Sequence, residues 1–150
     1  TGLFEGMALA AACGRAWRHI VAEEARLLEP ARLEDAILFG ARDIDDAEAA
    51  LIASAGLTRA ATVADLESTL GGAGSVYVHL DMDVHDALET RADASAIPGG
   101  PGVEEVRAAL TAIGNIKALA ITGLDPAAPD AARAADIAIE HVLAIAGDGA

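Results

Sequence analysis

Four side chains that can bind metal ions or protons follow one predicted strand. Residues 75–80, SVYVHL, have the β-branched and aromatic side chains typical of a buried strand, and Asp81, Asp83, His85 and Asp86 come directly after it. Side chains alternate along an extended chain, so Asp81 and Asp83 are expected to point to the same side, roughly 6.5 Å apart. Two such carboxylates repel each other unless one is protonated or a cation binds both. The pair predicts a site for a divalent cation, and its oxygen ligands favour Mg²⁺, Ca²⁺ or Mn²⁺.

A solvated acidic turn without a ligand is the alternative interpretation of this segment, because acidic residues are common in turns. Two specific motifs do not fit it. A calcium loop of the EF-hand type that starts at Asp81 requires glycine at its sixth position and glutamate at its twelfth, where this chain has Asp86 and Ala92. A phosphatase of the haloacid dehalogenase type resembles D-x-D followed by glycine and threonine, where this chain has Val84 and His85.

The rest of the sequence alternates between predicted strands and predicted helices. Buried strands are expected at 36–39, 75–80 and 117–122. Helices are expected at 46–55, 63–70, 102–114 and 130–147, with Thr62 as the N-cap of the second. The strands are almost continuously hydrophobic, which is typical of a parallel sheet covered on both faces. We therefore predict an α/β fold with three layers, α/β/α, and a mainly parallel sheet. Ligands of such sheets bind at the carboxyl ends of the strands, which is where Asp81 and Asp83 lie.

Composition narrows the class of protein. The 150 residues are typical of one domain, and 53% are hydrophobic but only 3% aromatic, so the core is built from aliphatic side chains. A net charge of -14 argues against nucleic acid or an anionic membrane as a partner. The single cysteine, Cys13, cannot form an internal disulfide, which favours a reducing compartment, the cytoplasm. The first ten residues show no basic start of a secretory signal.

Several segments together resemble the ureohydrolases, the family of arginase, agmatinase and formimidoylglutamase. The segment HLDMDVHDA at 79–87, followed by IPGGPGVEEV at 97–106, resembles the family pattern of strand, aspartate pair, glycine-rich turn and helix. GLFEGMALA, LFGARDIDDAE and LAITGLDPAAPD resemble three other family segments in the same order, and the resemblance extends over residues 1–146. It implies that residues 1–150 are a single, partial ureohydrolase domain, the C-terminal part of an arginase-like fold.

The resemblance also implies roles for particular residues. Asp81 and Asp83 match two aspartate ligands of a binuclear Mn²⁺ centre, whose shared water attacks the guanidinium carbon so that urea leaves. Asp45 matches a residue that contacts the substrate, and Glu48 lies beside it. Glu5 stands where the family has a histidine that relays protons. Asp45 and Glu48 also have the spacing of a capping box, and both roles can hold at once.

Other residues are expected to support this site. His79 is predicted to lie in the core or beside the ligands, His85 in a partly exposed loop or, as the alternative, beside the ligands, and Asp86 next to the metal ligands. Arg42 is expected to form an ion pair within its turn. The sequence departs from the family at Gly123, where the family has a glutamate that pairs with the guanidinium group. The family segments that supply the other metal ligands, G-G-D-H-S and D-A-H-x-D, do not occur in this sequence.

Two functions remain open on this basis. The first is a manganese-dependent hydrolase that cleaves a C–N bond of a small guanidino or amidino substrate and releases urea. The second is a catalytically degenerate ureohydrolase homologue that serves as an oligomer subunit or a regulatory protein. In either case the resemblance implies a homo-oligomer, a trimer or a hexamer.

Overall fold

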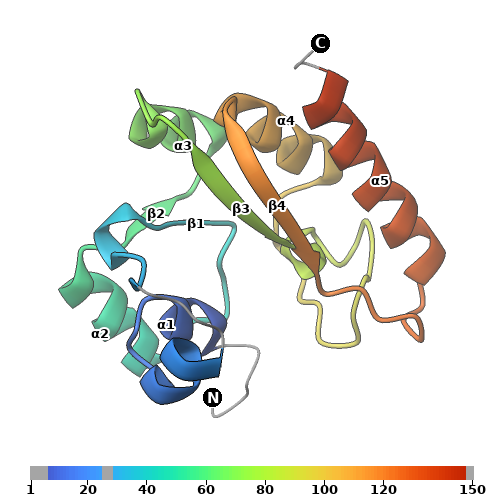
Figure 1. Ribbon diagram of the computed structural model, residues 1–150. Coiled ribbons are helices and arrows are strands. Elements are labelled where there is room, and N and C mark those ends of the chain that lie inside the picture. The colour runs from blue at the N-terminus through green and yellow to red at the C-terminus, as the bar shows by residue number, and fades with distance from the viewer. Residues whose placement is uncertain (1–6, 25–28, 148–150) are drawn as a thin grey trace. The chain divides into compact units, whose positions relative to one another are not determined.

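The structure is a computed structural model, and it describes residues 7–24 and 29–147 (Figure 1). The chain falls into two compact units. The first comprises Thr1–Leu38 and Asp43–Arg59, and the second comprises Phe39–Arg42 and Ala60–Ala150. Each unit is described by itself below, and the assignment of residues 1–150 to a single partial domain remains a prediction.

The first unit contains short helices and the segment expected to bind substrate. Its elements are α1 (Ala8–Ala12), a π-helical turn (Ile20–Glu24), a 3₁₀ turn (Leu33–Asp35) and α2 (Asp46–Ala55). Strands β1 (Ile37–Phe39) and β2 (Thr58–Ala60) pair in a two-stranded sheet. Helix α2 begins with a capping box formed by Asp45 and Glu48, and it ends at Gly56, whose φ of 70° is favourable only for glycine.

The second unit contains the predicted aspartate pair. Its elements are α3 (Val63–Leu70), β3 (Val76–Asp81), the 3₁₀ turn η4 (Met82–Val84), α4 (Val103–Ile113), β4 (Ile116–Thr122) and α5 (Ala131–Gly147). Strands β3 and β4 are parallel and lie side by side, with α4 connecting them (Figure 1). The register places Leu80 beside Ile121 and Asp81 beside Thr122. The two strands therefore end at the same edge, as parallel strands joined by a crossover helix do.

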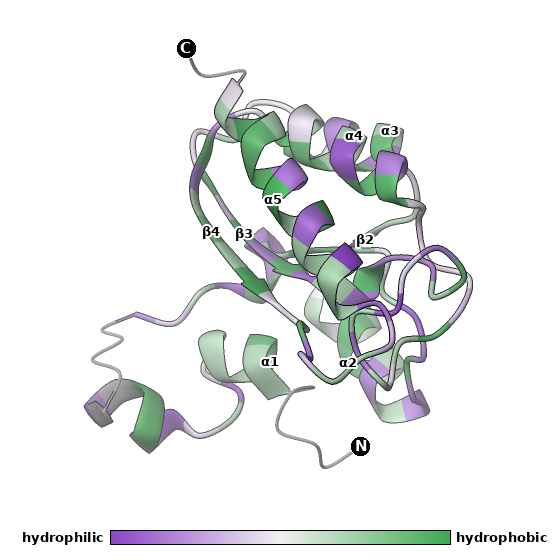
Figure 2. Ribbon diagram, turned by 90° about the vertical axis from the view of Figure 1, so that its right-hand side faces the viewer, coloured by the Kyte–Doolittle hydropathy of each residue, from purple (hydrophilic) through white to green (hydrophobic). Residues whose placement is uncertain are grey.

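The core of the second unit lies between the β3–β4 pair and the helices α4 and α5. Its buried residues are Leu80, Met82, Ala92, Val106, Leu110, Ala134, Ile137 and Ala138. In Figure 2, α5 carries hydrophobic and hydrophilic bands in alternation, which is the pattern of a helix with one face in a core. Along β3 the side chains alternate, so Leu80 and Met82 point into the core while Tyr77, His79 and Asp81 are exposed.

The predicted fold class is confirmed: the chain alternates strands and helices, and its longer strands are parallel. The helices at 46–55 and 63–70 have the predicted caps, since Thr62 forms a capping box with Asp65 as Asp45 does with Glu48. Strand β2 was not predicted because its sequence, TRA, lacks the hydrophobic run that identifies β1. The helical turns of three to five residues were not predicted because they are too short to show a hydrophobic period. None of the described helices is long and apolar enough to cross a lipid bilayer.

Candidate metal site

Asp81 and Asp83 converge at the carboxyl end of β3. Asp81 is the last residue of the strand and is exposed, whereas Asp83 lies in η4 and is half-buried. Met82 between them is fully buried in the core, which turns both aspartates to the other side of the chain. The Asp83 backbone N–H donates to Asp81 Oδ1 at 3.3 Å. The alternation predicted from the sequence is therefore realised, even though the strand itself ends at Asp81.

The Asp81 carboxylate and burial both affect the protonation of Asp83. Burial raises the pKa of the Asp83 carboxyl, and the negative charge of Asp81 raises it further, while the Arg42 guanidinium acts in the opposite direction. A raised pKa means that the site favours a positive charge, which a proton supplies in the absence of any other cation. A divalent cation bound by both carboxylates would satisfy the same electrostatic demand.

Asp81 is oriented by a hydrogen-bonded chain that starts on the neighbouring strand. The Thr122 hydroxyl donates to Asp81 Oδ2 at 3.3 Å, and His79 Nε2 lies 2.8 Å from the same Thr122 oxygen. Because the hydroxyl proton points to Asp81, the His79 ring must donate to Thr122. His79 is exposed, so its predicted place in the core is wrong, but it does support a candidate ligand indirectly. The role of Thr122 follows from the strand register, which the sequence alone does not provide.

His85 is buried, so the prediction of a partly exposed loop histidine is wrong. Its side chain and that of His141 from α5 are both 0% exposed, and their Nε2 atoms are 3.0 Å apart. The rings are nearly parallel, with an interplanar angle of 6°. His85 Nδ1 donates to the Met82 carbonyl oxygen at 2.9 Å, because a carbonyl can only accept. His85 Nε2 must then accept a hydrogen bond from His141 Nε2–H. The pair thus links α5 to Met82, the residue between the two aspartates.

Neither histidine of this pair favours a charged state. Burial lowers the pKa of His85, and burial together with the neighbouring His85 and Arg107 lowers the pKa of His141 to about 4. The Nδ1 atom of His141 is buried without a hydrogen-bond partner among the described residues. The pair is therefore neutral at pH 7 and acts as a structural link rather than as a source of charge.

Asp86 organises the loop that follows the aspartate pair. Its Oδ1 accepts hydrogen bonds from the backbone of Leu88 at 3.0 Å and of Gly99 at 3.2 Å. Its own N–H donates to the Pro101 carbonyl oxygen at 3.0 Å. These bonds give Asp86 a loop-closing function, and its predicted position next to a metal remains a prediction.

The residues expected to bind substrate belong to the first unit or lie outside the described residues. The Glu48 backbone N–H donates to Asp45 Oδ1 at 2.8 Å, and the Asp45 N–H donates to Glu48 Oε2 at 3.2 Å. The bond from Glu48 lowers the pKa of the Asp45 carboxyl. The capping role is thus confirmed, and the substrate role remains a prediction. Glu5, the predicted proton relay, lies outside the described residues.

Gly123 is in direct contact with Asp81. It follows β4 with a φ of 68°, a conformation that residues with a side chain rarely adopt. A Cβ atom at this position would collide with Asp81 Oδ1 and would lie 3.1 Å from the Met82 backbone nitrogen. A side chain at position 123 would therefore displace the carboxylate of Asp81.

The donor set fits a hard cation in part. Asp81 and Asp83 supply carboxylate oxygens, which suit Mn²⁺. Within residues 7–24 and 29–147, no group of three or more His, Cys, Asp or Glu side chains is placed to hold a metal ion. The two aspartates can therefore contribute to a metal centre but need further ligands.

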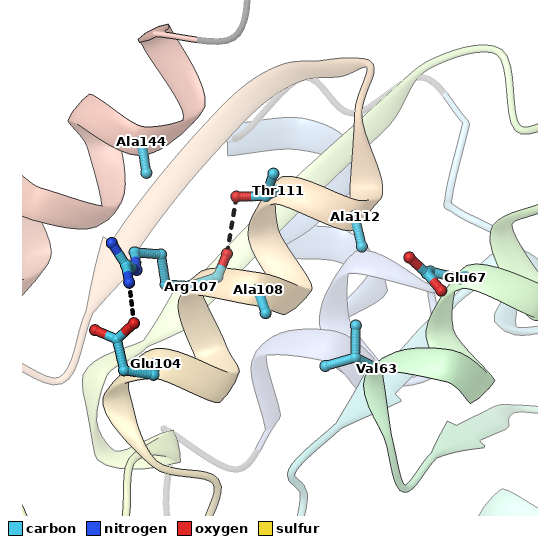
Figure 3. Close-up of a pocket in the computed structure, with 8 residues that line it drawn as sticks. All are labelled: Val63, Glu67, Glu104, Arg107, Ala108, Thr111, Ala112 and Ala144. Atoms are coloured by element: carbon cyan, nitrogen blue, oxygen red, sulfur yellow. Dashed lines mark hydrogen bonds and ion pairs between the residues drawn. The ribbon is translucent and has the colours of Figure 1, made fainter.

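A surface groove of about 560 Å³ lies elsewhere in the second unit, between α3 and α4 (Figure 3). Its lining residues are Val63, Glu67, Glu104, Arg107, Ala108, Thr111, Ala112 and Ala144. Glu104 and Arg107 form an ion pair with each other within α4, and Thr111 donates to the Arg107 carbonyl oxygen. None of the candidate metal-site residues lines this groove, so it is separate from the site at the end of β3.

Solved structures with a similar fold are ureohydrolases. Arginase from Bacillus subtilis is 22% identical, with a TM-score of 0.79 over 91% of this chain and 53% of its own. Arginase from Entamoeba histolytica is 16% identical, with a TM-score of 0.79 over 98% of this chain and 53% of its own. Proclavaminate amidino hydrolase from Streptomyces clavuligerus is 19% identical, with a TM-score of 0.64 over 88% and 48%. No family model and no curated protein matches the sequence.

These likenesses establish the fold. The chain has part of an arginase-like α/β fold, and it spans about half the length of the solved structures that it matches. The resemblance recognised in the sequence motifs is therefore confirmed at the level of the fold.

Proposed function

We propose that this chain is part of a manganese-dependent hydrolase that cleaves a C–N bond of a guanidino or amidino compound and releases urea. The observation that carries this proposal is the convergence of Asp81 and Asp83 at the end of β3, where burial and the charge of Asp81 raise the pKa of Asp83. The arginase-like fold supports it, because the structures that share this fold include arginases and an amidino hydrolase.

In this proposal Asp81 and Asp83 hold one side of a binuclear Mn²⁺ centre. When bound, such a centre lowers the pKa of a water molecule so that hydroxide is available near neutral pH. Thr122 and His79 fix the orientation of the Asp81 carboxylate through their hydrogen bonds. The remaining ligands come from outside the described residues. Asp45 contacts the substrate with Glu48 beside it, and Glu5 relays protons.

A degenerate homologue that acts as a subunit of a trimer or hexamer is the second candidate, and Gly123 favours it. A cationic substrate that loses its carboxylate partner in a buried site binds more weakly by roughly 2 to 5 kcal/mol. The collision of a Cβ atom at Gly123 with Asp81 shows that no side chain fits there while Asp81 keeps its position. A cytoplasmic location is part of both proposals, because the sequence holds a single cysteine.

Calorimetric titration with Mn²⁺ tests the metal site. We expect the parent chain to bind Mn²⁺ and the Asp81→Ala, Asp83→Ala double variant to bind none. Asp65→Ala is the matched control, because Asp65 is an acidic residue of the same unit whose oxygens accept bonds from Thr62. If the parent and the double variant bind Mn²⁺ equally well, the aspartate pair is not the metal site.

Urea release separates the two candidate functions. The Mn²⁺-loaded protein is incubated with a panel of guanidino and amidino compounds, and urea or ammonia is measured over time. Release that depends on Asp81 and Asp83 supports the hydrolase. Tight Mn²⁺ binding without release from any compound of the panel supports the degenerate homologue, whose oligomeric state is then measured by light scattering.

A further inference from the structure

We propose that Arg42 is the positioning residue of the candidate metal site: its guanidinium group holds the turn at residues 83–85 so that Asp83 faces Asp81. Arg42 belongs to the second unit together with the aspartate pair, although about forty positions separate it from them in the sequence. The effect of Arg42 on metal binding rests on the proposed function. Its effect on the turn at residues 83–85 follows from the hydrogen bonds of its side chain alone.

The guanidinium group uses all of its donors on main-chain carbonyl oxygens. Nη2 donates to the carbonyls of Asp83 at 2.6 Å and His85 at 3.1 Å, and Nη1 donates to that of Val84 at 2.9 Å. Three consecutive carbonyls of the turn therefore point to one side chain. An arginine is suited to this arrangement because its five N–H groups are fixed in one plane.

The same guanidinium group connects this turn to two other segments. Nε and Nη2 reach the Ile97 carbonyl at 3.1 Å and 2.7 Å, and Nη1 reaches the Gly40 carbonyl at 3.3 Å. Ile97 lies at the far end of the loop that follows the aspartates, so one side chain closes that loop across its whole length. Without Arg42, these carbonyl groups would lose their donors in a partly buried place, which is costly.

Two glycines allow the backbone to lie close to the turn that Arg42 holds, and one of them also makes room for the guanidinium group. A Cβ atom on Gly100 would lie 2.8 Å from Arg42 Nη1 and would collide with the Val84 carbonyl oxygen. A Cβ atom on Gly40 would lie 2.7 Å from a methyl group of Val84, and Gly40 has a φ of 68°. The backbone on both sides of the guanidinium group thus lies so close to the turn that only glycine fits.

The partners of the Arg42 guanidinium group are the main-chain carbonyl oxygens of five residues. A lysine would keep the positive charge but has only three donors on one atom, so it cannot serve the five carbonyls.

The first test measures the loop without any metal. Hydrogen exchange of the Asp86 and Thr90 amides, which are bonded to Pro101 and Asp86, reports whether the loop is closed. We expect Arg42→Met to speed this exchange at least about 10-fold and Arg42→Lys to speed it less, with β3 and β4 unchanged. Arg133→Met, at an exposed position on α5, is the control for the loss of one positive charge. Unchanged exchange in both Arg42 variants would overturn the proposal.

The second test measures Mn²⁺ affinity by titration of the same proteins. Removal of a group that orients a metal ligand typically weakens metal binding about 10- to 100-fold, and we expect this range for Arg42→Met and Arg42→Lys but not for Arg133→Met. Wild-type affinity in both Arg42 variants would show that Arg42 does not position Asp83. If the parent chain binds no Mn²⁺, the proposed function fails, and the exchange result alone decides on Arg42. Arg42→Lys keeps the test valid if Arg42→Met does not fold.

Discussion

Two pairs of acidic residues look alike in the sequence but differ in the structure. Asp45 and Glu48 in the first unit exchange hydrogen bonds with each other's backbone and begin α2. Asp81 and Asp83 in the second unit face each other, and the hydrogen bonds that Asp81 receives from Asp83 and Thr122 are long, at 3.3 Å each. The pKa of Asp45 is lowered by its backbone partner, whereas the pKa of Asp83 is raised by burial and by Asp81.

This difference separates a structural acid from a candidate ligand. An acid at a helix N-terminus is already stabilised as an anion by the backbone N–H groups, so its presence needs no ligand. A half-buried acid whose pKa is raised by burial and by a neighbouring carboxylate is unfavourable for the fold, and such groups are typical of functional sites. The opposite pKa directions of Asp45 and Asp83, rather than the number of acidic residues, therefore single out Asp83 beside Asp81.

The largest expected effect comes from filling the space between Gly123 and Asp81. Gly123→Ala must adopt a φ of 68° and displace the Asp81 carboxylate, so we expect the free energy of unfolding to fall by roughly 2 to 5 kcal/mol. Gly114→Ala is the matched control, since Gly114 has a φ of 73° but open space around its Cβ position. Chemical denaturation measures both variants. Only Gly123→Ala should also weaken Mn²⁺ binding, and equal effects of the two variants would refute the contact with Asp81.

Replacing Asp83 and, separately, Asp65 tests whether a candidate metal ligand and a helix-capping acid affect stability in opposite directions. Asp83→Asn removes the repulsion from Asp81, so we expect the metal-free protein to melt at a higher temperature and the Mn²⁺ affinity to fall about 100-fold. Asp65→Asn weakens a capping box, so we expect a lower melting temperature and an unchanged Mn²⁺ affinity. The gain from Asp83→Asn should be largest at pH 7 and should shrink on acidification, because wild-type Asp83 then becomes protonated in the folded state. A lower melting temperature for Asp83→Asn would contradict the repulsion.

The sequence predicted the parts of this site that depend on local pattern. The strand before Asp81, the caps at Asp45 and Thr62, and the common direction of the two aspartates follow from periods and spacings of a few residues. The arginase-like fold was recognised because several segments matched a known family in the same order.

The contacts between distant segments could not be predicted. Arg42 and Ile97 are 55 positions apart, and His85 and His141 are 56 apart, so no local pattern links them. His85 was predicted to lie in a partly exposed loop, but a buried partner on α5 satisfies its ring nitrogen. The role of Thr122 depends on strand register, which hydrophobic periodicity does not determine.

The smallest expected effect is the change in folding stability with pH that comes from the histidine pair. Acidification destabilises the fold through His141, whereas it stabilises the fold through Asp83. The pKa of His141 in the folded state is about 4, below the usual 6.5, because the ring is buried and faces His85 and Arg107. The unfolded chain therefore binds a proton more readily between these two values. The stabilising contribution of neutral His141 is fully present above pH 6.5 and is lost progressively as the pH falls towards 4, by roughly 2 kcal/mol. Acidification should thus favour the fold at Asp83 and disfavour it at His141.

Denaturation at pH 7.5 and 5.0 separates these two contributions. In the His85→Leu, His141→Leu double variant both polar partners are replaced by apolar groups, so we expect a folded protein whose stability no longer falls through the His141 window. In that background the opposite effect of Asp83 should become visible as a gain of stability on acidification, and adding Asp83→Asn should remove the gain. If the double variant loses as much stability as the wild type between the two pH values, the histidine pair does not cause the loss.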